Sequence, residues 1–321
     1  MKKIIITGAS GFIGTNLLEK FIDDGFEVLN IDFNKPQRHE HLRYWENIDI
    51  TNFEELQKKF FSFEPNYIVH LAARTDLEGD SLKDYDANIL GVENLMKITK
   101  NLNSLKKIII TSSMLVCHSE YIPINELDYA PTTIYGESKV LTEKKVRENS
   151  PNCDWAIIRP TSIWGPWFSV PYKNFFDMII ARKYFHIGDR GCTKTYGYIS
   201  NAVYQIEQIL FSETTSNKKK VFYIGDYQPT NIENWADEIA SELEISIKKI
   251  PYFFIKIIAI GGDVLKRLGI DFPMTSFRLK NMTTNNKVDL TDTVAIAPKL
   301  PFSRLEGVKE TLNWMKAQKH K

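Results

Sequence analysis

Two hydrophobic periods alternate along the first half of the chain. Short continuous apolar runs, typical of buried strands, stand between longer segments whose apolar residues return every three or four positions, as in amphipathic helices. The predicted strands are Lys3–Thr7, Glu27–Asp32, Asn66–Ala72, Lys107–Thr111 and Trp155–Arg159. The predicted helices are Gly14–Asp24, Phe53–Ser62, Asp86–Lys100 and Ile134–Asn149. This order predicts an α/β protein with a Rossmann-like, doubly wound parallel sheet covered by helices on both faces.

The pattern changes after Arg159. Prolines and aromatic residues crowd Pro160 to Pro171, and short strands and helices then mix without regular alternation. We therefore expect a smaller, mixed α/β C-terminal lobe that binds substrate, with Val221–Ile224 returning as a strand of the first lobe. The predicted division is 1–166 for the Rossmann domain, with 197–225 returning to it, and 167–196 plus 226–321 for the substrate lobe.

Composition narrows the classes of function. The 321 residues carry 41 Lys and Arg against 40 Asp and Glu, a net charge of +1, which argues against a broad nucleic-acid surface. The three cysteines lack metal-ligand spacing, so we expect no metal site and a reduced, cytoplasmic protein.

A strongly apolar helix is predicted over 252–268. It is too short to span a bilayer, so we expect no membrane insertion. We favour a place in the core or in a dimer interface for this helix over a lipid-facing role.

The segment Thr7–Gly14 links the first strand to the first helix. Gly8 allows the turn off the strand, Gly11 leaves room for a pyrophosphate near the backbone, and Gly14 allows close packing of helix on strand. The helix start adds free N–H groups and a partial positive charge. This context predicts a dinucleotide site.

Asp32 ends the second strand, 18 residues after Gly14. A carboxylate there can accept hydrogen bonds from the adenosine ribose and repels a 2′-phosphate, which favours NAD over NADP. Lys35 and Arg38 lie just beyond Asp32. Their positive charges favour a 2′-phosphate, and therefore NADP.

Tyr135 and Lys139 lie four residues apart at the start of a predicted helix, hence on one face. A nearby ammonium stabilises a phenolate, so the tyrosine can exchange a proton with a substrate hydroxyl while hydride leaves the carbon. Ser112 and Ser113 follow the strand Lys107–Thr111, at the sheet edge where open α/β sheets bind ligands. A serine hydroxyl there can hydrogen-bond the reacting oxygen.

In this order the motifs resemble the extended short-chain dehydrogenase/reductases, in particular the NAD-dependent epimerase/dehydratase group that acts on nucleotide sugars. Thr7–Gly14 resembles the TGxxGxxG loop, His70–Ala73 the HLAA strand end, and Tyr135–Lys139 the YxxxK pair. Asp49-Ile50 resembles the adenine-contacting pair, Asn88, Gly91 and Asn94 the NxxGxxN helix, and Arg159-Pro160 with Trp164-Gly165-Pro166 the segment beside the nicotinamide.

The resemblance implies roles for these residues. It makes Tyr135 the acid/base, Lys139 the holder of the nicotinamide ribose and Ser113 a polariser of substrate. The implied NAD contacts are Gly8, Gly11, Phe12, Ile13, Gly14, Asp32, Asp49, Ile50, Leu71, Ala72, Ala73, Asn88, Ser112, Tyr135, Lys139 and Pro160. The implied substrate contacts are Arg74, Thr75, Met114, Thr161 and Lys194. It also implies a homodimer through the helix bearing Tyr135 and the one before it.

Two departures shape the functional hypotheses. Met114-Leu115 follow Ser113 where sugar 4,6-dehydratases carry Asp-Glu, so water elimination by that route is not expected. Lys194 stands where the family often has an arginine for the substrate diphosphate, and it lacks bidentate geometry. We expect an NAD-dependent nucleotide-sugar epimerase or a sugar dehydrogenase/4-reductase. The alternatives are a 3β-hydroxysteroid-type dehydrogenase, which the apolar helix favours, and a non-catalytic NAD-binding regulator.

Overall fold

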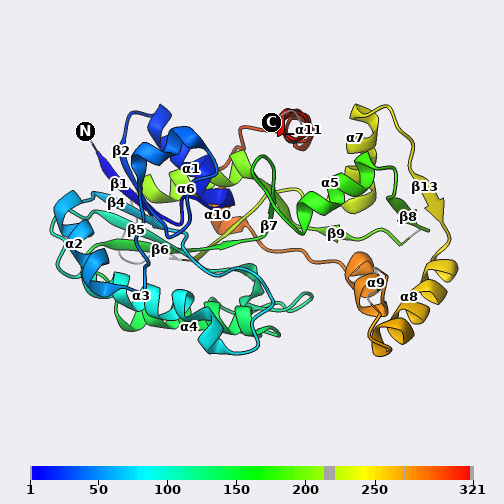
Figure 1. The fold of residues 1–321 in the computed structure, drawn as a ribbon, viewed down its shortest axis with the longest axis horizontal. Helices are drawn as coiled ribbons and strands as arrows, with labels where there is room; N and C mark the ends of the chain where they lie inside the picture. Colours follow the sequence, from blue (N-terminus) through cyan, green and yellow to red (C-terminus); the bar gives the residue numbers. More distant parts are fainter. Residues whose placement is uncertain (1, 189, 213–220, 271, 273, 319–321) are drawn as a thin grey trace.

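Seven parallel strands form the central sheet, in the order β11-β6-β5-β4-β1-β2-β3 (Figure 1). The computed structural model describes residues 2–188, 190–212, 221–270, 272 and 274–318. The strands of this sheet are β1 (Lys3–Thr7), β2 (Glu27–Ile31), β3 (Trp45–Glu46), β4 (Tyr67–His70), β5 (Lys107–Thr111), β6 (Asp154–Pro160) and β11 (Val221–Ile224). The chain leaves β1 toward one edge and returns at β4 toward the other, which makes β1 and β4 the switch point where such sheets bind ligands.

Helices cover both faces of the sheet (Figure 1). One face carries α1 (Phe12–Asp23) and α6 (Ile199–Phe211), and the other carries α2 (Phe53–Phe63), α3 (Asp86–Thr99) and α4 (Ile134–Glu148). Alternate residues of β1 divide between the two layers: Ile4 and Ile6 join one apolar cluster, and Ile5 joins the other. Burial on both sides explains the continuous apolar runs, and the predicted fold class is confirmed.

The boundaries differ slightly from prediction. The helix expected from Gly14 begins two residues earlier, at Phe12, and the strand expected to reach Ala72 ends at His70. β3 was not predicted, because a two-residue strand carries no periodic pattern.

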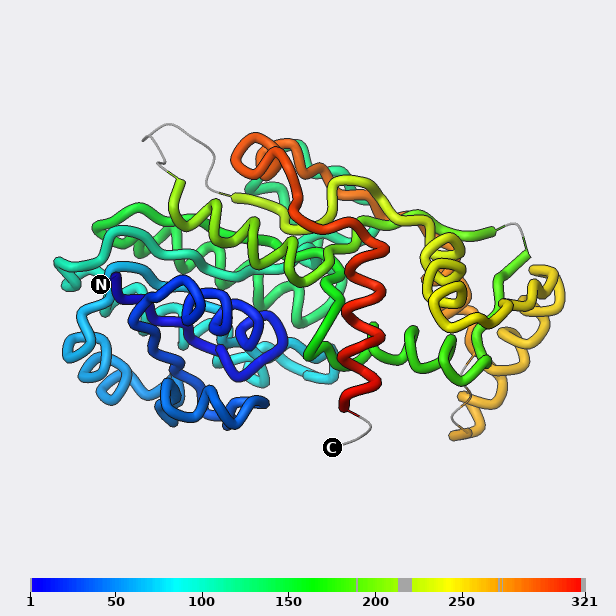
Figure 2. The backbone as a smooth tube through the Cα atoms, turned by 90° about the horizontal axis from the view of Figure 1, so that it is seen from above, coloured from blue at the N-terminus to red at the C-terminus, as the bar shows by residue number. Residues whose placement is uncertain are grey.

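The second lobe contains short paired strands and several helices (Figure 2). Its elements are α5 (Tyr172–Ile180), β8 (Phe185–Ile187), β9 (Thr193–Lys194), β12 (Thr230–Asn231), α7 (Ile232–Glu242), β13 (Lys248–Ile250), α8 (Tyr252–Arg267), α9 (Ser276–Thr283) and α11 (Arg304–Gln318). α10 (Thr291–Ile296) packs instead against α6 and β11 of the first lobe. The domain division given above stays a prediction.

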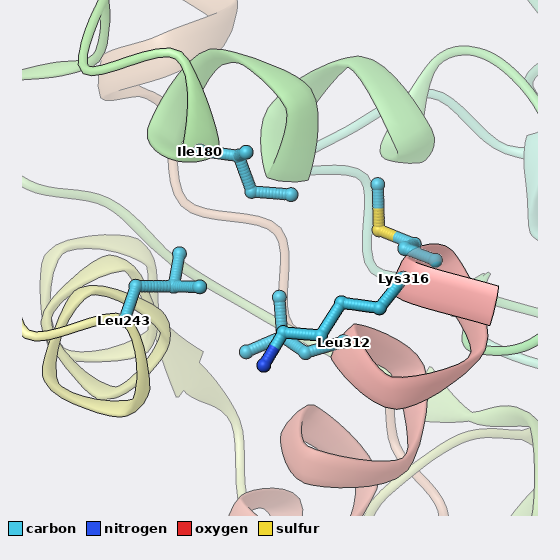
Figure 3. A pocket seen from close by; sticks show the side chains of 5 residues that line it. Ile180, Leu243, Leu312 and Lys316 are labelled. Carbon is cyan, nitrogen blue, oxygen red and sulfur yellow. The ribbon is translucent and has the colours of Figure 1, made fainter. Parts of the chain in front are cut away.

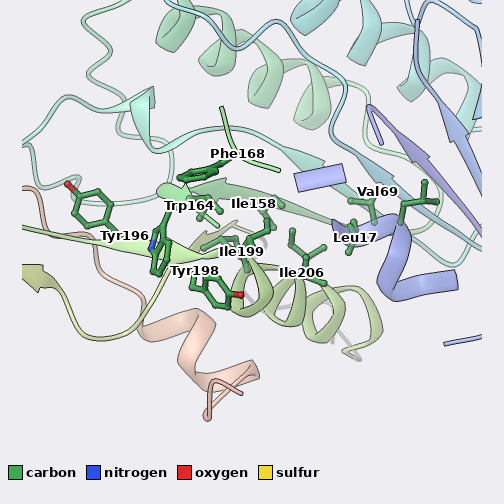
Figure 4. Close-up of a cluster of buried hydrophobic side chains, with 14 of the residues drawn as sticks. Leu17, Val69, Ile158, Trp164, Phe168, Tyr196, Tyr198, Ile199 and Ile206 are labelled. Atoms are coloured by element: carbon green, nitrogen blue, oxygen red, sulfur yellow. The ribbon is translucent and has the colours of Figure 1, made fainter. Parts of the chain in front are cut away.

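An aromatic cluster joins the two lobes (Figure 4). β7 (Ser162–Trp164) pairs in parallel with β10 (Tyr196–Tyr198). The Trp164 ring centroid lies 4.9 Å from that of Trp235 on α7 and 5.8 Å from that of Phe176 on α5. The same buried cluster reaches Ile158 and Val69 in the large sheet, so the lobes share one core.

The apolar helix predicted over 252–268 is α8. Of the two places expected for it, the core is wrong for most of its apolar side chains, and the dimer interface stays a prediction. Only Ile255, Ala259 and Gly262 of α8 are buried, whereas Phe253 is 66% and Phe254 57% exposed. Periodicity predicts the helix but cannot say which face a neighbour covers. Within the described ranges, no helix is long and apolar enough to cross a membrane.

Candidate active site

The loop between β1 and α1 approaches neighbouring backbone closely. Gly8 has a φ of +77°, and a Cβ there would lie 2.5 Å from the Ala72 nitrogen. A Cβ on Gly14 would lie 2.4 Å from the Gly8 carbonyl oxygen. A side chain at Gly8 would therefore push the loop away from the segment after β4, and one at Gly14 would push the start of α1 away from the loop.

The start of α1 is available for an anion. Gly11, the N-cap residue, is exposed and has no side chain that could cap the helix. The N–H groups of Phe12 and Ile13 are in the first turn, which has no intrahelical acceptors for them. Together with the helix dipole, these free N–H groups can bind a phosphate at the sheet's switch point.

Asp32 lies directly after β2 and is buried next to this loop. Its carboxylate oxygens accept hydrogen bonds from the backbone N–H of Ser10 at 3.1 Å and of Asn34 at 2.9 Å. Burial raises the pKa of Asp32, although these hydrogen bonds oppose the shift. Arg38 is ion-paired with Glu19. Its positive charge is therefore already balanced by a carboxylate and is less available to a 2′-phosphate. The geometry agrees with a ribose-binding carboxylate.

Three residues of α3 fasten the loops that surround this site. The Asn88 side chain accepts a hydrogen bond from the Arg74 N–H at 2.8 Å and donates one to the Arg74 carbonyl at 3.0 Å. A Cβ on Gly91 would lie 2.4 Å from Cδ1 of Ile50. The Asn94 amide donates to the Ile50 and Thr51 carbonyls. The NxxGxxN spacing thus holds the segments after β3 and β4 at the edge of the sheet.

The segment Leu71–Ala73 runs from the end of β4 past the glycine loop. The Leu71 N–H bonds the Thr7 carbonyl at 2.9 Å, and the Thr7 hydroxyl lies 2.6 Å from Nδ1 of His70. Burial lowers the pKa of His70 to about 3, so the imidazole is neutral. His70 acts as a fixed structural partner of Thr7.

Ser113, Tyr135 and Lys139 come together at the carboxyl end of β5. Ser113 hydrogen-bonds the Tyr135 hydroxyl, and the Lys139 Nζ lies 5.9 Å from the centroid of the Tyr135 ring. Lys139 also donates to the Thr111 carbonyl at 3.0 Å. The structure therefore gathers the three predicted catalytic residues in one place.

Burial sets the proton affinities of this pair. It raises the pKa of Tyr135 to about 12, with the Ser113 hydrogen bond opposing the shift, and it lowers the pKa of Lys139 to about 8. A buried phenol next to an easily deprotonated ammonium is a pair prepared for proton transfer.

Local packing fixes the start of α4. The Thr133 hydroxyl caps it by accepting a hydrogen bond from the Gly136 N–H at 3.0 Å. A Cβ on Gly136 would lie 2.3 Å from the Leu115 carbonyl oxygen, in the turn that follows Ser113. Gly136 thus brings the helix bearing Tyr135 against the turn bearing Ser113.

A buried carboxylate, Glu143, lies one turn beyond Lys139 and was missed by sequence reasoning. It accepts hydrogen bonds from the Ser112 hydroxyl at 2.7 Å and from the Arg159 guanidinium at 2.8 and 2.9 Å. Burial alone favours the neutral acid, yet the hydrogen bonds and charge of Arg159 hold the pKa of Glu143 below its usual range. The signal was a Tyr-x-x-x-Lys-x-x-x-Glu spacing, which also fits an exposed helix face.

The remaining predicted site residues do not form one cluster, and most of them contact local neighbours. The Arg74 guanidinium forms a two-point pair with Asp76, Thr75 is exposed, and Lys194 on β9 donates to the Asn281 carbonyl at 2.7 Å. The Thr161 hydroxyl donates a hydrogen bond to the Ile224 carbonyl at 2.8 Å. Pro160, the residue before Thr161, is half-buried. Met114, next to Ser113, is half-buried. Asp49 is exposed, and its carboxylate accepts a hydrogen bond from the Thr51 N–H.

A separate hollow opens among α5, α7 and α11 (Figure 3). It is lined by Ile180, Leu243, Leu312, Met315 and Lys316. It contains none of the predicted site residues, and we interpret it as a packing gap. Within the part of the chain that the structure describes, no group of three or more His, Cys, Asp or Glu gathers to hold a metal.

Comparisons with known proteins identify the family of the chain. A sequence model of the NAD dependent epimerase/dehydratase family matches residues 4–206. An N-acetyl-α-D-glucosaminyl-diphospho-ditrans,octacis-undecaprenol 4-epimerase of Escherichia coli O157:H7 is 27% identical over 322 residues, covering 97% of this chain and 94% of that protein. A 3-beta-hydroxysteroid dehydrogenase of Mycolicibacterium neoaurum is 24% identical over 73% of this chain and 68% of its own.

A solved structure shares the fold. The UDP-glucuronic acid 4-epimerase from Bacillus cereus, in complex with UDP-glucuronic acid and NAD, aligns with a TM-score of 0.75 at 18% identity. The alignment covers 98% of this chain and 99% of that one.

Proposed function

Because the chain belongs to the NAD-dependent epimerase/dehydratase family, we propose that it is a 4-epimerase of a sugar diphosphate, with a nucleotide sugar as the substrate class. The observation that carries this proposal is the meeting of Ser113, Tyr135 and Lys139 beside the glycine loop at the end of β5. Retention of all three also argues against a non-catalytic NAD-binding regulator.

The residues of the glycine loop, the end of β2 and the segment after β4 fit NAD. The close approaches at Gly8 and Gly14 leave the first turn of α1 for the pyrophosphate, and Asp32 supplies the ribose carboxylate. Leu71, Ala72 and Ala73 form the segment beyond β4, and Lys139 is the proposed partner of the nicotinamide ribose. Bound NAD supplies a reversible acceptor for the hydride of a sugar carbon.

Tyr135 then acts on the sugar hydroxyl. Its phenolate takes the hydroxyl proton while the carbon is oxidised, and returns it when the carbon is reduced from the other face of the sugar. The Lys139 ammonium stabilises the phenolate, and the Ser113 hydroxyl polarises the reacting oxygen. Met114 and Leu115 have no group that transfers protons, so water elimination by that route is not expected at this site.

The substrate proposal takes support from the relatives. One acts on a sugar joined by diphosphate to undecaprenol, and a structural neighbour binds UDP-glucuronic acid. What these substrates share is a sugar on a diphosphate. Lys194 and Arg74 are the proposed partners of the diphosphate, and Thr75, Met114 and Thr161 the proposed contacts of the sugar.

Assembly and location are part of the same proposal. We place a homodimer interface on α3 and α4, and the protein in the cytoplasm, where the three free cysteines stay reduced.

A 3β-hydroxysteroid-type dehydrogenase is the second candidate. It is favoured by the exposed apolar face of α8 and by the relative from Mycolicibacterium neoaurum. Such an enzyme accumulates NADH with a sterol, whereas an epimerase ends with its NAD unchanged.

The experiment is Tyr135→Phe, assayed on UDP-glucose, UDP-glucuronic acid and N-acetylglucosaminyl-diphospho-undecaprenol. We expect turnover to fall by at least about 100-fold, because the acid/base is removed, with NAD binding unchanged. Phe61→Tyr on α2, an exposed position, is the matched control. A near-normal rate in Tyr135→Phe would remove Tyr135 from the mechanism.

A further inference from the structure

The outer face of α8 presents a continuous apolar stripe. Phe253, Ile257, Ile260, Val264 and Leu268 are spaced by three or four residues and so follow one face of the helix. Each is at least 51% exposed, Leu268 reaching 70%. Phe254 and Ile258 widen the stripe, and Phe277 on α9 is 75% exposed. A stripe of this size on the surface marks an interaction site.

The inner face of α8 is anchored, which fixes the direction of the stripe. Ile255 and Ala259 pack against Leu279 of α9 in a buried cluster. A Cβ on Gly262 would lie 1.9 Å from the Met274 carbonyl oxygen, so the helix meets that segment without a side chain between them. The Asp263 carboxylate accepts a hydrogen bond from the Ser276 N–H at 3.0 Å. The exposed face is therefore an outward surface of a fixed hairpin.

The charge around the stripe is strongly positive. The whole chain is nearly neutral, but residues 248–280 contain seven Lys or Arg and only two Asp. Lys256 and Arg267 lie about three turns apart along one edge of the stripe, and both are exposed. Their long side chains can follow an apolar surface and hold their charges at its boundary.

We propose that the exposed face of α8 docks the protein on the surface of an anionic lipid bilayer. An amphipathic helix with a wide apolar face and basic edges lies in the interface plane, buried to the depth of its side chains and held by anionic headgroups. The helix is too short and too charged to cross the membrane, so docking is peripheral.

The charge pattern argues for lipid over a second copy of the chain. A twofold contact through this face would bring two strongly basic surfaces together, and like charges oppose such a contact. The proposed dimer uses α3 and α4, which lie on the Rossmann part, away from α8 (Figure 1). The inference does not require the proposed chemistry, and its test has its own readout.

The test is co-sedimentation of the full chain with vesicles of phosphatidylcholine alone or mixed with phosphatidylglycerol. We expect binding to the anionic vesicles, weakened by salt. Phe253→Ser combined with Phe254→Ser should lower the partition coefficient at least about tenfold, because two apolar side chains leave the interface. Phe61→Ser, an exposed phenylalanine on α2, should leave it unchanged.

A charge-reversed pair tests the basic edge. Lys256→Glu with Arg267→Glu should abolish the preference for anionic vesicles, whereas Lys58→Glu on the exposed face of α2 should not. NAD binding in each variant verifies the fold. Failure of the wild-type chain to bind vesicles, equal binding by all variants, or a wild-type dimer that Phe253→Ser/Phe254→Ser dissociates would each overturn the proposal.

Discussion

At the residue scale, the account depends on two side chains whose proton affinities are moved by burial. Tyr135 is 7% and Lys139 3% exposed. The motif was sufficient to find both residues and Ser113. It could not give the size of their pKa shifts, since those depend on how completely α3, α4 and the turn after β5 exclude water.

The pH dependence of kcat/KM follows from these shifts. Below about pH 8, Lys139 keeps its proton, and each pH unit raises the phenolate fraction of Tyr135 tenfold. Above it, the gain in phenolate is cancelled by loss of the Lys139 charge, until Tyr135 itself titrates near pH 12. We therefore expect kcat/KM to rise up to about pH 8 and then level.

A pH–rate profile checks this, with Lys139→Met as the comparison. Without the ammonium the rate should be low and the break near pH 8 should vanish. A profile for the wild type that is flat from about pH 6 to 8 would contradict the assignment of Tyr135 as base.

At the scale of elements, α4 is the part that connects chemistry to scaffold. It carries Tyr135 and Lys139 on its first turns and Glu143 on the next. Glu143 accepts hydrogen bonds from Ser112, directly after β5, and from Arg159 on β6. Sequence periodicity predicted the helix and all the flanking strands. It could not identify Glu143 as buried, because its partners come from two other strands and an acidic residue on a helix is usually solvated.

Glu143→Ala should be strongly destabilising. It leaves Arg159, which is 1% exposed, as a buried cation without its carboxylate, at a cost of about 3–5 kcal/mol. Chemical denaturation measures the change. Glu148→Ala, near the exposed end of the same helix, is the control and should stay within about 0.5 kcal/mol. Equal effects of the two changes would show that the Glu143 network does not support the fold.

The same scale explains why the sequence could not say what covers α8. The apolar pattern predicted a helix correctly. The pattern is the same, however, whether the apolar face contacts the core, a dimer partner or lipid. Only the placement of α9 on one side decided which residues are covered.

At the scale of the molecule, the two lobes are joined by shared aromatic packing. Trp235 on α7 contacts Trp164, Tyr196 and Phe175, and all belong to or pack on the cluster that reaches the central sheet. The parallel sheet was predictable because each of its strands except the two-residue β3 has its own apolar run. The junction was not, because short strands such as β7 and β10 gain their partners only in the folded chain.

Trp235→Ala should therefore destabilise both lobes together. The side chain is 1% exposed, and its loss leaves a cavity that costs about 3–5 kcal/mol. Far-ultraviolet circular dichroism and NAD release should still report one coincident thermal transition, at a lower temperature. Separate transitions for the two signals would mean that the lobes unfold independently, and Phe61→Ala provides the exposed control.

The most direct test of the central claim follows the configuration at C4 of the sugar. The three sugar diphosphates named above, each carrying deuterium at C4, are incubated with the protein and NAD, and the products are resolved by NMR and mass spectrometry. We expect at least one to be inverted at C4 with its deuterium retained and without lasting NADH. Absence of inversion in all three, together with NADH that accumulates on a sterol, would contradict it.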